Sequence, residues 1–455
     1  MTDINLVERH IIKKSHVLFP YLDEYSFKAK NLYNRANYII RQVFVITSNL
    51  EKINNGEKNV IITDEQYTFL SEINDVVGLY NEFKESKNAV SNYKPLNYFD
   101  EDHKFVNYDF LNYYLKSEDC YKDLMTQVSQ QTLRLLEKNW KSFFEAIKQW
   151  STNKDKFLGQ PKLPKYFDKD GRSIFMFTNQ NCKLKDNFVI FPKVFNKFKI
   201  KTKVNNLRQI RVIPNYNHYV IEVVHKESQI DLLGDNDRYI GIDLGVNNLA
   251  AITNNFGAIP IILNGKSIKS MNQYYNKEMA HYRSVTKQMN KLDYSNKMAK
   301  LTFKRNNKID YALHCASKYI VEYALKYNCH TIVIGNNKNW KQESNIGKIN
   351  NQNFIQIPHQ KLIKEIEYKA SKYGINVIIV EESYTSGTSF IDGEEPIKEN
   401  YNIKRRIKRG LFVSDANKTI NADVNGSYQI IKKAFPNAFC NGIEGVGLHP
   451  IMVNC

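Results

Sequence analysis

The sequence predicts a mixed α+β protein of several domains, and three observations support this fold class. First, 42% of the 455 residues are apolar, which is normal for a folded chain, and the length suffices for two to four structural units. Second, helical periodicity dominates the first third of the chain, and short β-like segments follow it. Third, strand-like and helix-like segments alternate after residue 238.

The N-terminal half combines helices with short strands. Residues 1–20 are predicted to be extended. Apolar residues recur at i, i+3, i+4 and i+7 within 24–150, which predicts a helical region whose middle, roughly 50–120, is hard to bound. After the turn-rich stretch 159–164, short β-like segments continue to about residue 228. They predict a small antiparallel barrel or sandwich, which the extended N-terminal piece could complete.

The C-terminal half begins after the polar segment 231–238, the best domain boundary in the sequence. Three predicted strands form a meander, and helices and strands then alternate, which is the order of an RNase H-like α/β sheet. The predicted strands are 239–244, 249–254, 259–263, 331–335 and 376–381, and the predicted helices are 268–305, 308–327, 358–374 and 424–434.

The charge balance is the most unusual property of the composition. There are 65 Lys and Arg against 47 Asp and Glu, a net charge of +18. Such an excess attracts polyanions, and nucleic acid is favoured over an anionic membrane surface or mere solubility. A basic run near the C-terminus is expected to contact phosphates, with a solvated loop as the alternative. It contains Lys404, Arg405, Arg406, Lys408 and Arg409.

No apolar stretch approaches the roughly 18 residues that a membrane span needs. The N-terminus lacks the apolar core of a signal peptide. We therefore expect a soluble, cytoplasmic protein, nucleoid-associated when bound to DNA, with no membrane partner.

Three carboxylates from separate segments form the candidate catalytic site. Asp243 lies within an apolar strand, where a carboxylate is costly unless it is paired or binds a cation, although it could instead cap the following turn. Asp423 lies at or just before the start of the last helix, where capping and catalysis are both open. The third acid is Glu381 or Glu382, at the end of "INVIIVEES", unless that strand merely runs into a charged loop.

These acids together predict a magnesium site, with manganese as a substitute. Hydrolysis of a phosphodiester needs cations that activate water and stabilise the leaving oxygen. Magnesium prefers carboxylate oxygens and retained waters, so His and Cys are not required. The six Cys are scattered and none forms a C-x-x-C pair, so we expect no zinc.

The segments "GIDLGVNNLAAIT", "SYTSGTSF" and "INADVNGS" resemble the three catalytic regions of TnpB proteins, transposon-encoded RNA-guided DNA nucleases related to type V CRISPR effectors. The N-terminal pieces "ERHIIKKS", "FKAKNLYNRANYIIRQ" and "KLPKY" are similar to that family's opening strand, recognition helices and wedge barrel. The resemblance implies an oligonucleotide-binding-like barrel that a helical recognition lobe interrupts, followed by a RuvC-type nuclease domain with a small insertion.

The resemblance also implies domain ranges and partners. The partners are a guide RNA and target double-stranded DNA with a short flanking motif. The ranges are 1–20 for the first barrel strand, 21–150 for the recognition lobe, 151–230 for the rest of the barrel, 238–383 for the first part of the RuvC domain, 384–420 for the inserted region, 421–436 for the final RuvC helix and 437–455 for the tail.

By resemblance, Asp243 and Asp423 are catalytic, metal-binding residues. The family often carries Glu where this chain has Gly335, but some relatives have a relocated Glu three residues before "TS", which is Glu382 here. Because neighbouring strand residues face opposite sides, Glu381 is then solvated. The resemblance further implies that lysines of the N-terminal motifs bind nucleic acid. They are Lys13, Lys14, Lys162 and Lys165.

The inserted region 384–420 has no Cys or His, whereas family members often carry two C-x-x-C pairs there. Ser389 and Asp392 stand at the first pair. We expect the region to fold without zinc, through apolar contacts of residues such as Phe390 and Phe412 with the catalytic core.

The sequence therefore predicts an RNA-guided, magnesium-dependent DNA endonuclease. One rival is a nuclease-inactive, guide-directed DNA-binding repressor, which Gly335 favours. A second is a compact type V CRISPR effector. A third, a protein-only RNase H or Holliday-junction resolvase, is disfavoured by the large basic N-terminal half.

Overall fold

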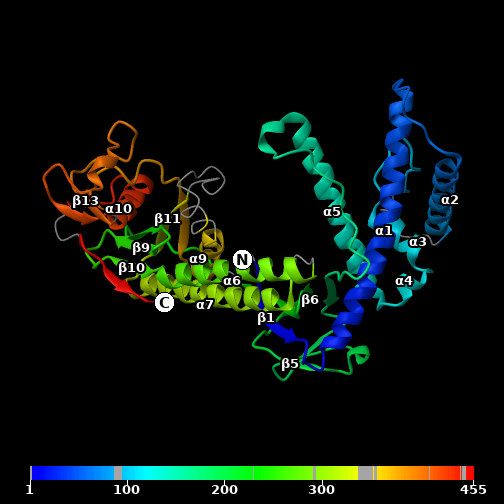
Figure 1. Cartoon of the computed structure of the whole chain (residues 1–455), viewed down its shortest axis with the longest axis horizontal. Coiled ribbons are helices and arrows are strands. Elements are labelled where there is room, and N and C mark those ends of the chain that lie inside the picture. Colours follow the sequence, from blue (N-terminus) through cyan, green and yellow to red (C-terminus); the bar gives the residue numbers. More distant parts are fainter. Residues whose placement is uncertain are drawn as a thin grey trace. The chain divides into compact units, whose positions relative to one another are not determined.

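In the computed structural model, the chain folds into two compact units (Figure 1). One unit comprises residues 4–227, and the other comprises 228–455 with residues 1–3. The described residues are the whole chain except 1–2, 87–94, 229, 291–293, 337–351, 353–355, 409, 441, 443–446 and 455.

Helices form most of unit 4–227. The first of them begins at Phe19 rather than near residue 24, and the extended N-terminal strand ends at Lys13 rather than near residue 20. Pro20 stands in the first turn of this helix, where a missing N–H costs nothing, and so helps to set its start. The helices are α1 (Phe19–Asn54), α2 (Asp64–Ser86), α3 (Tyr108–Leu115), α4 (Asp119–Lys122), α5 (Thr126–Thr152), η1 (Lys154–Lys156) and η2 (Lys193–Phe195).

The strands of this unit pair into two sheets, not into one closed barrel. One sheet has the order β1-β7-β6-β2, and the other has the order β3-β4-β5. The first strand of the chain thus joins strands from beyond residue 174, as predicted. The strands are β1 (Asp3–Lys13), β2 (Phe175–Thr178), β3 (Lys183–Lys185), β4 (Phe188–Ile190), β5 (Lys199–Lys201), β6 (Leu207–Asn215) and β7 (His218–Ser228).

One continuous hydrophobic core joins the helices and the sheets of unit 4–227. Helix α5 buries Trp140 completely, and the Trp140 indole Nε1 donates a 2.9 Å hydrogen bond to Oδ1 of Asn37 on α1. In the β part, Phe177 packs edge-on against Phe195, with ring centroids 5.2 Å apart. The helices and the strands of this unit therefore fold as one packed body.

The second unit is built on a sheet with the order β12-β11-β8-β9-β10-β15. Strands β8, β9 and β10 form an antiparallel meander, and β8, β11 and β12 run parallel, which is the predicted order. Strand β15, which pairs in parallel with β10, was not predicted. The strands are β8 (Tyr239–Leu244), β9 (Asn248–Asn254), β10 (Ile261–Asn264), β11 (Thr331–Gly335), β12 (Asn376–Val380), β13 (Leu411–Val413), β14 (Thr419–Asn421) and β15 (Ile451–Val453).

Helices cover both faces of this sheet. Ile240 and Ile242 of β8 belong to the core that α7 and α9 complete, whereas α10 packs on the opposite face. The predicted helix break at 306–307 is wrong. Helix α7 instead begins after Ser295, whose hydroxyl caps it, and continues because Ile309 is buried. The helices are α6 (Lys266–Asn290), α7 (Asn296–Lys326), α9 (His359–Ser371), α10 (Ala422–Ala434) and η3 (Ile403–Arg405).

Among the helices of the described residues, none combines the length and the apolar character needed to cross a lipid bilayer.

Candidate active site at the carboxyl ends of β8, β11 and β12

Asp243 lies near the end of β8, on the sheet face that α10 covers. Its strand neighbours Ile242 and Leu244 belong to the opposite, apolar core. A Cβ atom built on Gly426 of α10 would lie 2.8 Å from Asp243 Oδ2, so the carboxylate rests directly against this helix. Only a residue without a side chain allows α10 to approach the carboxylate so closely.

Glu382 approaches the same sheet edge from β12. This strand ends at Val380, one residue earlier than predicted, and Gly335 of β11 pairs with Val380. Glu381 is exposed, whereas Glu382 is partly buried. A Cβ atom built on Gly335 would lie 2.9 Å from Glu382 Oε2. The Glu382 carboxylate and the Ile430 side chain of α10, whose Cδ1 would lie 2.5 Å from the same atom, therefore share the space at the end of β11.

Asp423 stands in the first turn of α10 and does not cap it. The cap is Asn421, whose Oδ1 accepts hydrogen bonds from the backbone N–H groups of Asp423 and Val424 at 3.0 and 3.2 Å. The Asp423 carboxylate instead accepts from Asn248 Nδ2 at 2.5 Å and pairs with Arg406 Nη2 at 3.2 Å. The capping alternative for Asp423 is therefore wrong.

The electrostatic surroundings of Asp243 include the other two carboxylates. Loss of hydration raises the pKa of Asp243 well above its usual range, and the charges of Glu382 and Asp423 raise it further, while Arg406 lowers it. Burial raises the pKa of Glu382 to about 7, and Lys433 opposes this shift. Carboxylates that repel one another at one place favour a bound cation.

Sequence reasoning missed three polar residues around this site. Asn248 orients the carboxylate of α10. The Nε2 atom of the buried His359, at the start of α9, lies 3.0 Å from the carbonyl oxygen of Gly245, just after β8. Lys433 donates to the carbonyl oxygen of Ser383 at 3.0 Å, beside the third acid. Asn248 could have been found in the "GVNN" motif, but no local signal marks the other two.

Comparisons with known proteins match two segments that lie almost entirely in the second half of the chain. Residues 222–341 match the family model OrfB_IS605, described as a probable transposase, and residues 359–430 match the TNB domain model of Cas12f1-like proteins. The TnpB-like protein ORF457 of Acidianus two-tailed virus is 24% identical over 207 residues, which are 44% of this chain. The chain is TnpB-like. The match spans about two fifths of the viral protein's length, 42%.

Solved structures of RNA-guided effectors are also similar to the TnpB-like chain. A Cas12f1–sgRNA–target DNA complex is 16% identical, with a TM-score of 0.34, and the match covers 93% of this chain and 98% of that one. The mini-RNA-guided endonuclease Cas_phi3 is 10% identical, with a TM-score of 0.42, and the match covers 99% and 94%.

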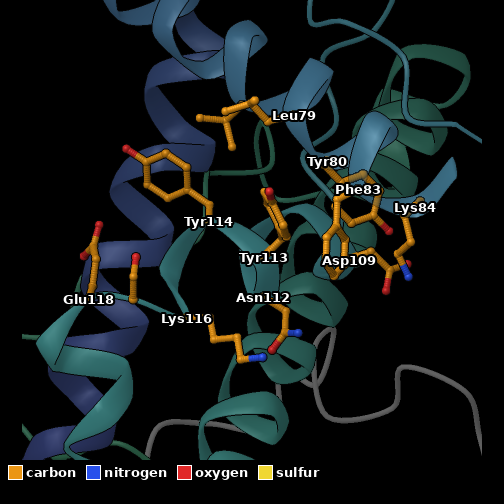
Figure 2. A pocket seen from close by; sticks show the side chains of 12 residues that line it. Leu79, Tyr80, Phe83, Lys84, Asp109, Asn112, Tyr113, Tyr114, Lys116 and Glu118 are labelled. Carbon is orange, nitrogen blue, oxygen red and sulfur yellow. The ribbon is translucent and has the colours of Figure 1, made fainter. Parts of the chain in front are cut away.

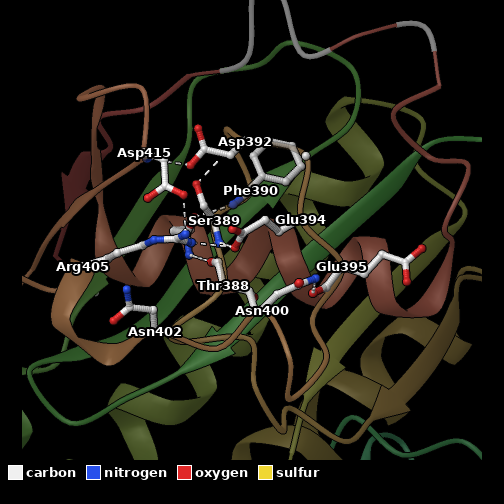
Figure 3. A network of polar contacts seen from close by, with 12 residues as sticks. Thr388, Ser389, Phe390, Asp392, Glu394, Glu395, Asn400, Asn402, Arg405 and Asp415 are labelled. Atoms are coloured by element: carbon white, nitrogen blue, oxygen red, sulfur yellow. Dashed lines mark hydrogen bonds and ion pairs between the residues drawn. The ribbon is translucent and has the colours of Figure 1, made fainter.

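The inserted region of the TnpB-like chain contains a polar network centred on Arg405 (Figure 3). Arg405 Nη1 lies 2.7 Å from Glu394 Oε2, and Arg405 Nη2 lies 2.6 Å from Asp415 Oδ2. The backbone N–H of Ser389 donates to the same Glu394 oxygen at 2.7 Å, and that of Asp415 donates to Asp392 Oδ2 at 2.9 Å. Ser389 and Asp392, at the positions where the resemblance implies a Cys pair, thus belong to an ion-pair network.

Apolar contacts complete the inserted region. Phe390 stacks on Tyr428 of α10, with ring centroids 4.5 Å apart and planes at 13°. Phe412 and Ile420, on the β13–β14 hairpin, join the same buried cluster. The predicted contacts of Phe390 and Phe412 with the catalytic core are therefore present.

The predicted nucleic-acid-binding residues differ in their surroundings. Arg405 and Arg406 pair with carboxylates, so the alternative of a solvated loop is wrong for these two side chains, and the predicted phosphate contact stays a prediction. Arg409 lies outside the described residues. The others are exposed, each within its own unit: Lys13, Lys14, Lys162, Lys165, Lys404 and Lys408.

A hollow of about 790 Å³ lies in unit 4–227, between α2 and α3 (Figure 2). Aromatic rings line it, but its lysines, Lys84 and Lys116, are balanced by Asp109 and Glu118. A lining without excess positive charge gives no preference for a polyanion. We therefore do not assign this hollow to nucleic acid.

Proposed function

We propose that the protein is an RNA-guided, metal-dependent DNA endonuclease. The observation that supports this proposal most is that the charges of Glu382 and Asp423 act on the carboxylate of Asp243, near the carboxyl end of β8. Its charge of +18 supports polyanionic partners, which we propose are a guide RNA and target double-stranded DNA. Base pairing would supply the sequence specificity, and the protein would read a short flanking motif.

The donor set fits magnesium. All three candidate ligands are carboxylates, which are the hard oxygen donors that this cation prefers. Within the described part of the chain, no three His, Cys, Asp or Glu side chains lie close enough to form a ready metal cage. Magnesium does not need one, because it keeps several waters and shares its coordination with substrate phosphates.

Each protein group has a distinct task in this proposal. Asp243, Glu382 and Asp423 would hold the cation, which would activate water and stabilise the leaving oxygen. Asn248 fixes the orientation of Asp423 by its hydrogen bond. Arg406 balances negative charge beside Asp423 and can pair with a phosphate oxygen of the incoming strand.

The test begins with the RNA that co-purifies with the protein. Sequencing should show a discrete structured species, and a guide derived from it should direct cleavage of a plasmid library with a randomised flanking sequence. We expect linear product with magnesium and none with EDTA. Random cellular RNA, or intact plasmid with every flanking sequence, would contradict the proposal.

Gly335 keeps a second candidate function open, that of a nuclease-inactive, guide-directed DNA-binding protein. A glycine at the end of β11 offers no metal ligand. This candidate predicts guide-dependent binding of the same plasmid, measured by footprinting, with no cleavage in magnesium or manganese. Cleavage by the wild-type chain would eliminate it.

A further inference from the structure

Residues 161–167 have no regular secondary structure, yet side chains of α1 hold their backbone in place. Asn37 Nδ2 donates a 3.1 Å hydrogen bond to the carbonyl oxygen of Pro164. Asn34 binds both backbone groups of Phe167, each at 2.9 Å. Because three backbone groups are fixed by a helix of the same packed body, the segment is preorganised before any partner arrives.

This held segment presents aromatic rings beside a guanidinium. Arg41 Nε donates to the same Pro164 carbonyl at 3.1 Å, and the Arg41 guanidinium lies over the Tyr166 ring, 4.7 Å from its centroid. The Tyr166 residue remains 41% exposed. The adjacent Phe167 packs edge-on against Tyr33, with centroids 4.9 Å apart. A fixed, exposed ring backed by Arg suits stacking of an unpaired base.

A hollow of about 550 Å³ separates the segment from α5. Among the described residues that line it, none is acidic. An adjoining hollow of about 410 Å³ on α5 shares Ser142 and Ala146 with it and contains one acid, Glu145. Together the two hollows form a groove lined by four lysines and one acid, and Lys141 pairs with the neighbouring Glu137 at 3.3 Å, which reduces the positive excess without removing it. The lysines are Lys138, Lys141, Lys162 and Lys165.

This groove differs from the charge-balanced hollow between α2 and α3 in carrying an excess of positive charge beside its aromatic rings. Excess lysine follows a phosphate backbone, and an exposed ring takes a base. On α5, Asn139 Nδ2 donates to the Tyr33 hydroxyl at 3.1 Å and Ser142 Oγ donates to the Lys138 carbonyl at 2.9 Å, so the side-chain oxygens of both exposed residues can accept from a sugar 2′-hydroxyl. We propose that the groove binds an unpaired stretch of the guide RNA, with one base stacked on Tyr166. This inference rests on the proposed function.

The test uses the full-length protein, freed of bound RNA by nuclease and a high-salt wash. Fluorescence anisotropy without added metal measures its affinity for a 12-nucleotide unstructured RNA, the same sequence as DNA, and a double-stranded RNA. We expect Tyr166→Ala to weaken binding of the unstructured RNA about tenfold, because one stacked base is lost. Tyr166→Phe keeps the ring and should bind within about twofold of wild type.

Tyr67 on α2 provides the matched control, because it lies in the same unit and is 49% exposed. Tyr67→Ala should leave the affinity unchanged. Replacing both Lys162 and Lys165 by Gln should lower the slope of log affinity against log salt by about 1.4, since each single-strand phosphate contact contributes about 0.7. Lys58 is an exposed lysine outside the groove, and Lys58→Gln should change the slope of log affinity against log salt by no more than about 0.7.

The groove assignment is wrong if Tyr166→Ala binds like wild type, or if Tyr67→Ala loses as much affinity. Equal binding of the DNA or of the duplex would overturn the choice of occupant. Thermal unfolding checks that each variant is folded. If Tyr166→Ala is not folded, the salt dependence of the Lys162 and Lys165 double variant tests the groove instead. Guided cleavage is a separate measurement. If Tyr166→Ala weakens RNA binding but the wild-type protein does not cleave DNA, only the proposed nuclease activity is rejected. If the wild-type protein cleaves DNA and Tyr166→Ala binds RNA as well as wild type, only the groove assignment is rejected.

Discussion

The carboxylate of Glu382 borders the space that a side chain on Gly335 would enter, since a Cβ atom built on that glycine would lie 2.9 Å from Glu382 Oε2 and 2.5 Å from Ile430 Cδ1 of α10. Two neighbouring parallel strands thus converge on one position, which only one side chain can fill. A Glu at the end of β11 and a Glu after β12 are alternative ways to bring a carboxylate to this position. We therefore propose that the relocated acid replaces the missing one, and this can be tested directly.

Glu382→Gln should reduce guided cleavage by at least about a hundredfold, because the neutral amide replaces a proposed metal ligand with little change in shape. Its neighbour Glu381 is exposed and accepts a hydrogen bond from Ser383 Oγ. Glu381→Ala should therefore retain most of the activity. Single-turnover cleavage of a matched plasmid measures both variants. The reverse ranking would assign the third ligand to Glu381.

Asp243→Asn and Asp423→Asn should each abolish cleavage and leave guided DNA binding within about threefold of wild type. Both changes remove a proposed cation ligand, and losing negative charge near a phosphate does not weaken binding. Glu322→Gln, on an exposed face of α7, is the control and should cleave normally. Near wild-type cleavage by either Asn variant would show that the site is assigned wrongly.

The raised pKa of Glu382 predicts a pH-dependent stability. A carboxyl group whose pKa is about 7 in the folded state and about 4.5 when unfolded binds more protons when folded between these values. Its contribution to the free energy of unfolding therefore falls as pH rises from about 4.5 through 7. In metal-free buffer, the melting temperature of wild type should fall more between pH 5 and pH 8 than that of Glu382→Gln. Parallel curves would contradict this shift.

Removal of Arg406 should strengthen metal binding in the absence of nucleic acid. Its guanidinium lies 3.2 Å from Asp423 Oδ1 and places a positive charge where a cation would bind. We expect Arg406→Ala to bind manganese a few-fold more tightly, as measured by electron paramagnetic resonance titration, because such partly exposed pairs contribute up to about 1 kcal/mol. Lys408→Ala, in the same basic run but exposed, should match wild type. Weaker manganese binding by Arg406→Ala would rule out this competition.

The Arg405 network should stabilise the inserted region without zinc. The Arg405 side chain is 13% exposed, and its loss leaves Glu394 without this ion pair. Arg405→Ala should lower the free energy of unfolding by about 2 kcal/mol and speed proteolysis within 384–420. Lys404→Ala is the exposed neighbouring control. Elemental analysis that finds one zinc per chain, or an Arg405→Ala variant as stable as wild type, would contradict this account.

Most strands and helices of the second unit could be predicted from the sequence, because the patterns that specify them lie within each segment. Continuous apolar runs predicted β8, β11 and β12, and their order predicted the meander followed by parallel strands. Asp243 was noticeable because a carboxylate within such a run is costly. The break between α6 and α7 was misplaced, since tertiary burial of Ile309 carries the helix through two asparagines.

The sequence by itself determined five strands of the main sheet, β8 to β12, together with the positive charge, the absence of paired cysteines and a short set of candidate acids. Only the tertiary structure decided which acid reaches the site and which groups surround it. Glu382 and Gly335 are 47 positions apart in the sequence, and Asn248 and Asp423 are 175 apart, yet the members of each pair lie side by side. These contacts between residues distant in the sequence depend on strand register and on how α10 packs across the sheet. Local patterns specify where strands and helices form, but they do not specify the distances between side chains that those elements bring together.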